Sequence, residues 1–312
     1  MEQYFLDYAA LQQQRWMVSD NHRTDAFAQA ITEAVKPGDL VIDVGAGTGL
    51  LSILAAKAGA RQVVGVEKSN MAIHAKELIE HNGLTGRVEI FHGDAKDLQL
   101  NEKADLIVSE WIGHMGFVEA MFNSVMKVRD AWLKPGGKML PSSIDIMLAP
   151  IDDNELFYKY GPGYWQSQLV HGIDFSKFTA QELEMGHSSQ IRLYDKHVLA
   201  DAKSINHMDT VSAKPGAEKS VGSVEFVIQK DGEINGFAGY FSTQLSPNVV
   251  LDTSPASPHT HWSQTYLPFF PTKVKEGDKV NVNFDMDEAF NGSRQMKLNL
   301  RIEDKEIQYV LD

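Results

Sequence analysis

The 312-residue sequence contains no cysteine, has fewer basic than acidic side chains and lacks a long apolar run. Without cysteine there is no disulfide framework, cysteine-based zinc site, iron–sulfur cluster or thiol nucleophile. No stretch approaches the roughly 18 apolar residues of a membrane span, and residues 1–8 do not resemble a signal peptide. We therefore expect a cytoplasmic protein without a bound metal and without a membrane partner.

The charge balance is strongly acidic. The chain has 42 Asp and Glu residues against 29 Lys and Arg residues, a net charge of -13. A negative field repels phosphate backbones and attracts cations, so we expect no nucleic-acid partner, and a basic substrate is favoured. The acidity is equally consistent with a role in solubility alone, as in many bacterial-type proteins.

The first half alternates short apolar runs with amphipathic stretches, a rhythm typical of β–α units around a parallel sheet. The pattern predicts a doubly wound α/β domain. We expect strands at residues 40–44, 63–66, 88–91 and 105–108, and helices at residues 50–60, 71–81 and 119–132.

The second half, after Pro141, has apolar residues at alternate positions, which predicts antiparallel β structure. Residues 152–184 are rich in aromatic side chains and fit neither pattern. Such a segment is either a loop packed on its own domain or an arm that docks on a second subunit. The alternating stretches are residues 144–148, 223–228, 280–284 and 296–302.

A glycine-rich loop, residues 43–49, lies where the first predicted strand turns into the first helix. Its glycines allow a ligand to approach the backbone, and the following helix presents free amide donors. Glu67 ends the second strand, where an acid can bind both ribose hydroxyls, and Asp94 can accept from an adenine amine. The Gly-x-Gly-x-Gly spacing with Asp43 just upstream suits the ammonium and sulfonium of S-adenosylmethionine better than a dinucleotide pyrophosphate.

An acidic loop, residues 109–121, follows the fourth predicted strand at the edge where open α/β folds bind ligands. Two of its carboxylates, Glu110 and Glu119, are nine residues apart. Such a pair can bind a metal, separate two pKa values for acid–base work, or hold a cation. No further metal ligands cluster here, and a planar guanidinium is the cation that two carboxylates hold best.

Together these motifs resemble those of the protein arginine N-methyltransferases, over nearly the whole chain. The acidic loop is similar to the family's double-glutamate loop, and Thr260-His261-Trp262 to its Thr-His-Trp loop. The resemblance implies methyl transfer from S-adenosylmethionine to a guanidino nitrogen of arginine in a basic protein or peptide. A type I-like core and a bacterial origin are expected. The family's N-terminal helical motif is matched by Tyr4-Phe5, Tyr8, Met17, Asp20 and Arg23-Thr24.

The fold class implied is α/β plus β. Residues 1–36 are expected to form a helical segment that closes over the cofactor, and residues 37–142 a doubly wound Rossmann-like methyltransferase domain. Residues 143–312 are then an antiparallel β-barrel substrate domain with an inserted dimerisation arm at about 152–184. The resemblance thus favours the arm, and a homodimer.

The resemblance also assigns roles to single residues. The cofactor's amino acid and ribose are expected to be held by Asp43, Gly45, Gly47 and Glu67. Its carboxylate is expected to pair with Arg23, and its adenine to face Asp94 and the backbone at Ala95. Tyr8 and Met17 are expected to cover it. The catalytic residues implied are Glu110 and Glu119, which hold the guanidinium, and the pair of His261 and Asp20. His114, Met121 and Trp262 are placed on the substrate side with them.

Three positions depart from the family pattern. The family often has histidine at Gln14 and aromatic residues at His114 and Val118, inside the acidic loop. A small guanidino compound such as free L-arginine is therefore an alternative substrate. A S-adenosylmethionine-binding regulatory protein without catalysis is a second alternative, against which the intact acidic loop argues. Met17 and Met121 match methionines of the asymmetric dimethylating members, so two methyl groups on one nitrogen are expected.

Overall fold

The computed structural model of this protein describes residues 10–117, 121–289 and 295–311. Among the residues singled out from the sequence, Tyr4, Phe5, Tyr8, Val118 and Glu119 lie outside these ranges. No helix in the described ranges is long and apolar enough to cross a membrane.

The first half is built around a five-stranded parallel sheet with the order β3-β2-β1-β4-β5. The central strand β1 is buried throughout, as expected for a strand between two layers of helices. Its register places Asp43 beside Gly65 of β2 and Val108 of β4, so the chain segments that follow these strands meet at one edge. The strands are β1 (Leu40–Val44), β2 (Gln62–Glu67), β3 (Val88–His92), β4 (Ala104–Val108) and β5 (Leu133–Leu140).

Helices cover this sheet, and α3 also contacts β10 and β11 of the second half. The expected strands and the helix at residues 71–81 are confirmed, with small shifts at the ends. The helix expected at 50–60 ends at Lys57, and the one expected at 119–132 is described from Phe122. The helices are α2 (Leu11–Val18), α3 (Asn21–Ala34), α4 (Leu50–Lys57), α5 (Met71–His81), η1 (Ala95–Asp97) and α6 (Phe122–Trp132).

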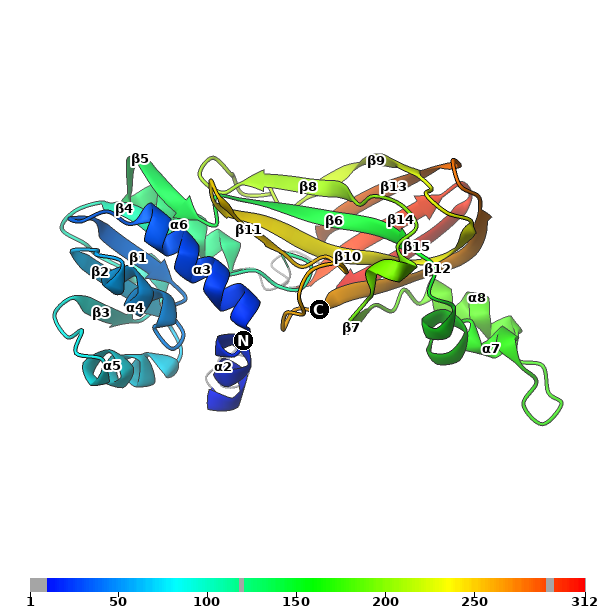
Figure 1. Ribbon diagram of the computed structural model, residues 1–312, viewed down its shortest axis with the longest axis horizontal. Coiled ribbons are helices and arrows are strands. Elements are labelled where there is room, and N and C mark those ends of the chain that lie inside the picture. The colour runs from blue at the N-terminus through cyan, green and yellow to red at the C-terminus, as the bar shows by residue number, and fades with distance from the viewer. Residues whose placement is uncertain (1–9, 118–120, 290–294, 312) are drawn as a thin grey trace.

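The second half consists of two antiparallel sheets that curve around a common core (Figure 1). The core contains packed phenylalanines, among them Phe237 and Phe269, which meet edge to face with ring centroids 5.6 Å apart. The antiparallel structure is confirmed, and closure of its strands into a barrel stays a prediction. One sheet contains β6 (Ser143–Ile151), β7 (Ser189–Ile191), β8 (Lys203–Asp209), β10 (Gly232–Ser246), β11 (Val249–Asp252) and β12 (Gln264–Val274); the other contains β9 (Ser220–Val227), β13 (Lys279–Glu288), β14 (Met296–Ile302) and β15 (Lys305–Leu311).

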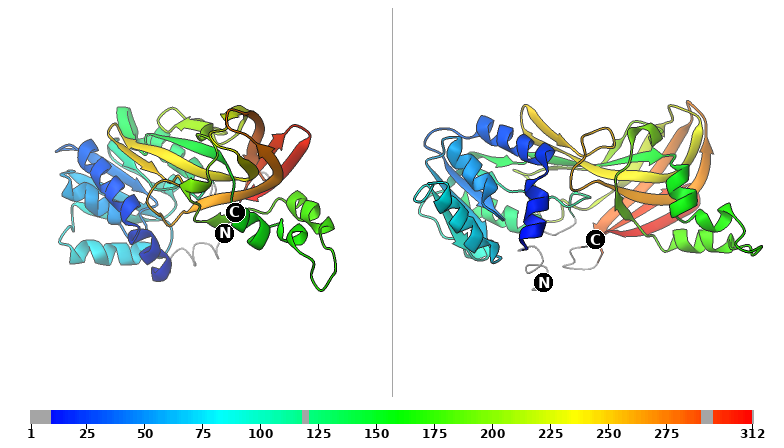
Figure 2. Two further views of the ribbon diagram at one scale, coloured as in Figure 1. Left: turned by 45° about the vertical axis from the view of Figure 1, so that its right-hand side comes forward. Right: turned by 60° about the horizontal axis from the view of Figure 1, so that its bottom comes forward.

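The aromatic segment between β6 and β7 projects from the second half, as the two views of Figure 2 show. Its elements are η2 (Leu156–Tyr160), α7 (Tyr164–Ser167) and α8 (Lys177–Glu184). The ring of Trp165 packs on Phe178 at 5.5 Å, which gives the segment a small core of its own. Leu169 and Ile173 are 64% and 57% exposed. The segment therefore has the form of an arm and leaves apolar side chains uncovered.

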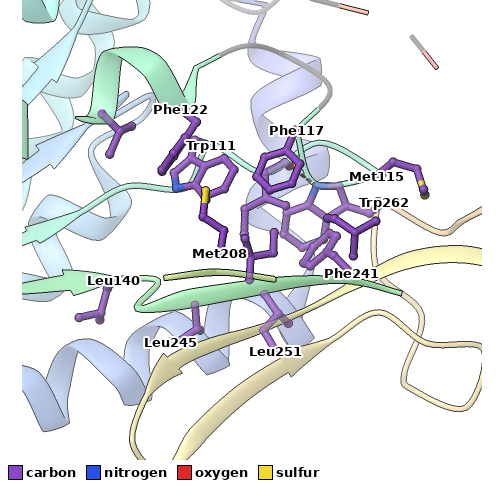
Figure 3. Close-up of a cluster of buried hydrophobic side chains, with 14 of the residues drawn as sticks. Trp111, Met115, Phe117, Phe122, Leu140, Met208, Phe241, Leu245, Leu251 and Trp262 are labelled. Atoms are coloured by element: carbon purple, nitrogen blue, oxygen red, sulfur yellow. Dashed lines mark hydrogen bonds between the residues drawn. The ribbon is translucent and has the colours of Figure 1, made fainter. Parts of the chain in front are cut away.

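A buried aromatic cluster joins the two halves behind the acidic loop (Figure 3). The ring of Trp111 lies 4.7 Å from Phe122 at the start of α6. On the other side, Phe241 of β10 meets Trp262 edge to face at 5.0 Å. Because packed aromatic rings tolerate little displacement, this cluster fixes the acidic loop relative to the Thr-His-Trp loop.

Candidate active site

Glu110 is presented by the loop that follows β4. Its side chain is only 8% exposed and forms an ion pair with Arg23 of α3. The carboxylate oxygen Oε2 accepts hydrogen bonds from Nη2 of Arg23 at 2.8 Å and from Nε at 3.2 Å. The other oxygen accepts from the amide of Ile112 at 2.9 Å. Glu110 is thus already oriented to hold a guanidinium, here that of Arg23.

Asp20 and His261 lie together, from segments 241 residues apart. Asp20 caps α3 by accepting from the amide of Arg23, and its Oδ2 accepts from Nδ1 of His261 at 2.7 Å and from the His261 amide at 2.8 Å. Burial opposes the charge, but the hydrogen bonds from His261 outweigh it and lower the pKa of Asp20. An ionised Asp20 therefore holds His261 with its proton on Nδ1 and Nε2 free to accept one.

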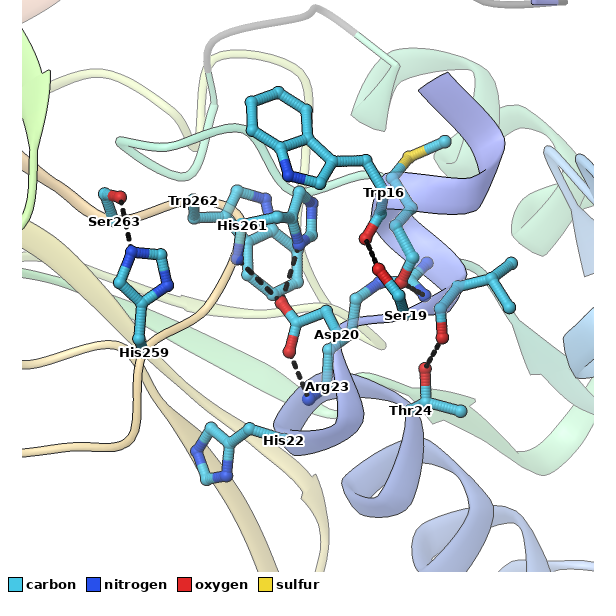
Figure 4. A network of polar contacts seen from close by, with 12 residues as sticks. Trp16, Ser19, Asp20, His22, Arg23, Thr24, His259, His261, Trp262 and Ser263 are labelled. Carbon is cyan, nitrogen blue, oxygen red and sulfur yellow. Dashed lines mark hydrogen bonds and ion pairs between the residues drawn. The ribbon is translucent and has the colours of Figure 1, made fainter. Parts of the chain in front are cut away.

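Trp262, which lies beside His261 in Figure 4, connects the two loops of the site. Its indole Nε1 donates to the carbonyl of Ile112 at 2.7 Å, and its ring lies 4.0 Å from that of His261. The side chain is 4% exposed. Trp262 holds the acidic loop and packs on His261 while it also lines a cavity, so its expected contact with substrate stays a prediction.

The glycine loop lies directly under α2 and Met121. Gly45 and Gly47 have φ values of 77° and 53°, which favour glycine. A Cβ on Gly45 would come within 2.7 Å of the Met121 methyl carbon, and one on Gly47 within 3.1 Å of the Gln14 side-chain oxygen. The cavity between the loop and α2 measures only about 30 Å³. This space is too small for a nucleoside, so a cofactor that enters between the loop and α2 must displace the side chains that line it, Gln14 among them.

Asp43 and Glu67 lie beneath this loop. Asp43 is fully buried, and its Oδ2 accepts from the hydroxyl of Ser52 at 2.7 Å. Its Oδ1 has no hydrogen-bond partner within the described part of the chain. Burial raises the pKa of Asp43 to about 6. Glu67 accepts from the amides of Gly47 at 2.8 Å and Ser69 at 2.7 Å. A buried carboxylate oxygen without a donor suits a cofactor that brings an ammonium.

Asp94 and Ala95 follow β3 at the same edge of the sheet. One oxygen of Asp94 forms an ion pair with Lys68 at 2.9 Å, and the other accepts from the Lys96 amide at 3.2 Å. The hydrogen bond from Lys68 is the main reason why the pKa of Asp94 is lowered. Ala95 begins η1. Both positions are partly exposed and remain available to an adenine ring.

A second cavity, of about 1030 Å³, opens on the other side of Glu110. We call it the groove. Met17 and Glu110 line both the groove and the small cavity, so the two spaces meet at these side chains. The groove also contains the expected residues Asp20, His114, His261 and Trp262. The described part of the site therefore has two cavities that share the carboxylate of Glu110.

Sequence reasoning missed several side chains of the site. Ser52 supports Asp43 from the first turns of α4, and Trp16, 64% exposed, lines the groove from α2. Arg192 and His259 line it as well. A serine in a helix gives no distinctive signal. Trp16 lies in a helix of only eight residues, and Arg192 and His259 lie in irregular segments. No periodic pattern there marks which side chains face a cavity.

Comparisons with known proteins agree with this arrangement. A family described as "Ribosomal protein L11 methyltransferase (PrmA)" matches residues 20–144, and one described as "Arginine methyltransferase oligomerization subdomain" matches residues 143–306. The chain is 34% identical to protein arginine N-methyltransferase PRMT10 of Arabidopsis thaliana, over 97% of this chain and 87% of that protein. It is 32% identical to a probable protein arginine N-methyltransferase 6 of the same plant, over 95% and 78%.

Solved structures match along almost the whole chain as well. The Trypanosoma brucei PRMT1 enzyme–prozyme heterotetrameric complex with AdoHcy superposes with a TM-score of 0.89 at 28% identity, covering 98% of this chain and 99% of that one. These relatives come from a plant and a trypanosome and do not bear out the expected bacterial origin. The chain belongs to the protein arginine N-methyltransferases, enzymes that use S-adenosylmethionine as methyl donor.

Proposed function

We propose that this enzyme methylates a guanidino nitrogen of arginine in a protein or peptide, with Glu110 at the point where cofactor and substrate meet. One observation carries the proposal: the two cavities share Glu110, whose carboxylate already accepts a forked guanidinium contact. A groove of about 1030 Å³ has room for residues on either side of a target arginine. This favours a peptide over free arginine.

The proposed role of Glu110 is electrostatic. A guanidinium is a poor nucleophile because its lone pairs are delocalised and it is protonated at neutral pH. Carboxylates on one face draw positive charge toward the nitrogens that they touch, which leaves more lone-pair density on the nitrogen that reacts. Glu119, outside the described residues, is proposed as the second carboxylate from the family resemblance.

The proton released on methylation needs an acceptor. We assign it to His261, because the ionised Asp20 holds the imidazole proton on Nδ1 and leaves Nε2 free. Glu119 is the alternative acceptor. The methyl donor supplies an activated methyl group and a sulfonium leaving group that needs no acid.

The cofactor is proposed to lie along the edge formed by the glycine loop, Glu67 and Asp94. The buried oxygen of Asp43 suits its ammonium, and the positive φ values at Gly45 and Gly47 allow its close approach. Tyr8, outside the described residues, and Met17 are proposed to cover it. Arg23 contacts Glu110 in the structure, and we propose that it turns to the cofactor carboxylate when both ligands bind.

The assembly proposed is a homodimer formed through the arm. The exposed apolar side chains of Leu169 and Ile173 support it, as does the match to an oligomerization subdomain. The two family matches meet at residues 143–144, which supports a domain boundary near residue 142. The barrel form of the second domain and a cytoplasmic location belong to the same proposal.

The first test is a competition assay with radiolabelled S-adenosylmethionine. A Gly-Arg-Gly peptide and free L-arginine are offered together, with Glu110→Gln as the blank. Label in the peptide is expected, and mass spectrometry should find asymmetric dimethylarginine, since Met17 and Met121 match the asymmetric members. Label in free arginine only would establish the small-molecule alternative. Cofactor binding without transfer to either substrate would favour the regulatory alternative.

A further inference from the structure

The groove has fewer free carboxylates on its walls than a site that only binds cations would have. Among the described residues that line it, Asp20 and Glu110 are the only carboxylates. Both are already paired, with His261 and Arg23 respectively. The other ionisable side chains that line it are Arg192 and several histidines. Away from the target guanidinium, the walls of the groove thus offer donors and positive charge.

Arg192 is the fixed cation of this surface. It directly follows β7, which pairs with β12 so that Ile191 lies opposite Gln264, and this places Arg192 beside the Thr-His-Trp loop. Its Nη2 donates to the carbonyl of Ser257 at 2.8 Å. Its Nη1 is buried and has no acceptor within the described residues. A buried donor without an acceptor is costly, and a ligand carboxylate would satisfy it.

Two histidines line the same groove as this cation. His259 contacts the hydroxyl of Ser263 through Nε2 at 3.5 Å, and its Nδ1 has no hydrogen-bond partner among the described residues. His22 is anchored through Nε2 to the Asp252 carbonyl at 3.3 Å. Figure 4 shows both rings on one side of the Asp20–His261 pair, from α3 and from the loop before β12. Imidazoles in this position can donate to a carboxylate.

We propose that Arg192, with His259 and His22, forms a carboxylate subsite that selects arginine substrates with an acidic group near the target guanidinium. The inference rests on the proposed function and names the substrate class of the same groove. The net charge of -13 attracts a cationic target from a distance. The guanidinium of Arg192 and the hydrogen-bond donors beside it in the groove then determine which neighbours of the target arginine are accepted.

The carboxylate can come from an acidic side chain or from the α-carboxylate of arginine itself, and the assay separates these sources. Peptides of one length carry a single arginine flanked by glycine, with one glutamate, lysine or serine placed on either side. L-Arginine is compared with L-argininamide. We expect kcat/KM for the glutamate peptides to exceed that for the lysine peptides about fivefold, the size of one partly exposed ionic contact.

Variants locate the effect. Arg192→Gln should remove the difference in kcat/KM between glutamate and lysine peptides, while kcat/KM for the serine peptide changes less than about twofold. Arg192→Lys should restore part of that difference. His259→Gln is expected to reduce it without disturbing the contact of Arg192 with the loop. Arg61→Gln is the matched control, because Arg61 pairs with Glu102 in the first half and does not line the groove.

A wild-type preference for lysine peptides, or a glutamate preference that survives both Arg192→Gln and His259→Gln, would overturn the proposal. Equilibrium binding of the fluorescein-labelled peptides is measured in parallel by anisotropy. This readout tests the subsite even if no arginine is methylated, in which case the proposed function fails separately. Equal affinity for the glutamate and lysine peptides in that experiment would also reject the subsite.

Discussion

Glu110 is the side chain that both cavities share. We predict that Glu110→Gln lowers kcat about 10²–10³-fold, because removing one preorganised electrostatic group typically costs that much. His261→Ala should be less damaging, because Glu119 is proposed as an alternative acceptor for the proton. Single-turnover assays at saturating cofactor measure both. Glu102→Gln, on the surface beside Arg61, is the matched control.

The relative size of these two losses in kcat distinguishes electrostatic stabilisation by Glu110 from acid–base catalysis by His261. A loss in Glu110→Gln equal to or smaller than that in His261→Ala would contradict the electrostatic role assigned to Glu110. Circular dichroism of each variant shows whether the fold is intact. The pairing of Glu110 with Arg23 also predicts that Glu110→Gln weakens the contact between the acidic loop and α3.

Asp43 makes the cofactor side sensitive to pH. Burial raises its pKa from 3.8 to about 6, so the folded protein binds this proton more tightly than the unfolded chain does. Its contribution therefore favours folding at low pH and is lost as the pH rises from about 4 to about 6, by up to about 3 kcal/mol. Asp43→Asn should flatten this part of the stability profile in thermal unfolding, whereas the exposed Asp304→Asn should not.

The same carboxylate gives the opposite trend for ligand binding. A cationic cofactor favours ionised Asp43, so its affinity should rise as the pH increases through about 6. Isothermal titration calorimetry of wild type and Asp43→Asn tests this. An affinity that is independent of pH in the wild type would remove Asp43 from contact with the cofactor's positive charge.

At the scale of elements, the hydrogen bond from Trp262 to the Ile112 carbonyl connects the Thr-His-Trp loop to the acidic loop. Trp262→Phe keeps an aromatic ring but removes the donor. We predict a loss of about 1 kcal/mol in the free energy of unfolding and a reduced kcat, with cofactor affinity unchanged. Urea titration and steady-state kinetics measure these quantities. Trp132→Phe, at the end of α6, is the control, and equal kinetic losses in both would refute the link.

The elements also show what sequence patterns can and cannot predict. The strand at residues 40–44 and the acid that ends the next strand were predictable, because buried parallel strands are continuous apolar runs and their ends meet at one edge. The contact of Arg23 with Glu110 and the lining of the groove by Arg192 were not. Both depend on how α3 and β7 pack against segments that are distant in the sequence, and local sequence patterns do not predict that packing.

At the scale of the whole molecule, the proposed role of the arm predicts the mass of the particle in solution. Leu169 and Ile173 are exposed at the arm and have no covering element in the described chain. If the arm forms the dimer, Leu169→Glu with Ile173→Glu should give a monomer in sedimentation velocity, where the wild type is a dimer. Val221→Glu on β9, where the valine is 81% exposed, should leave the dimer intact. A double variant that keeps the wild-type mass would exclude these contacts.

If the enzyme adds two methyl groups to one nitrogen, as proposed, the position of α2 affects how they are added. Gln14 and Met17 of this one short helix line the small cavity, and Trp16 and Met17 line the groove. If the cofactor binds beneath α2, as proposed, its exchange moves these side chains, and the same movement opens one wall of the groove. Dimethylation is therefore expected to be distributive, with release of monomethylated peptide between the two transfers. A pulse of labelled peptide chased with unlabelled peptide should yield free monomethyl product first.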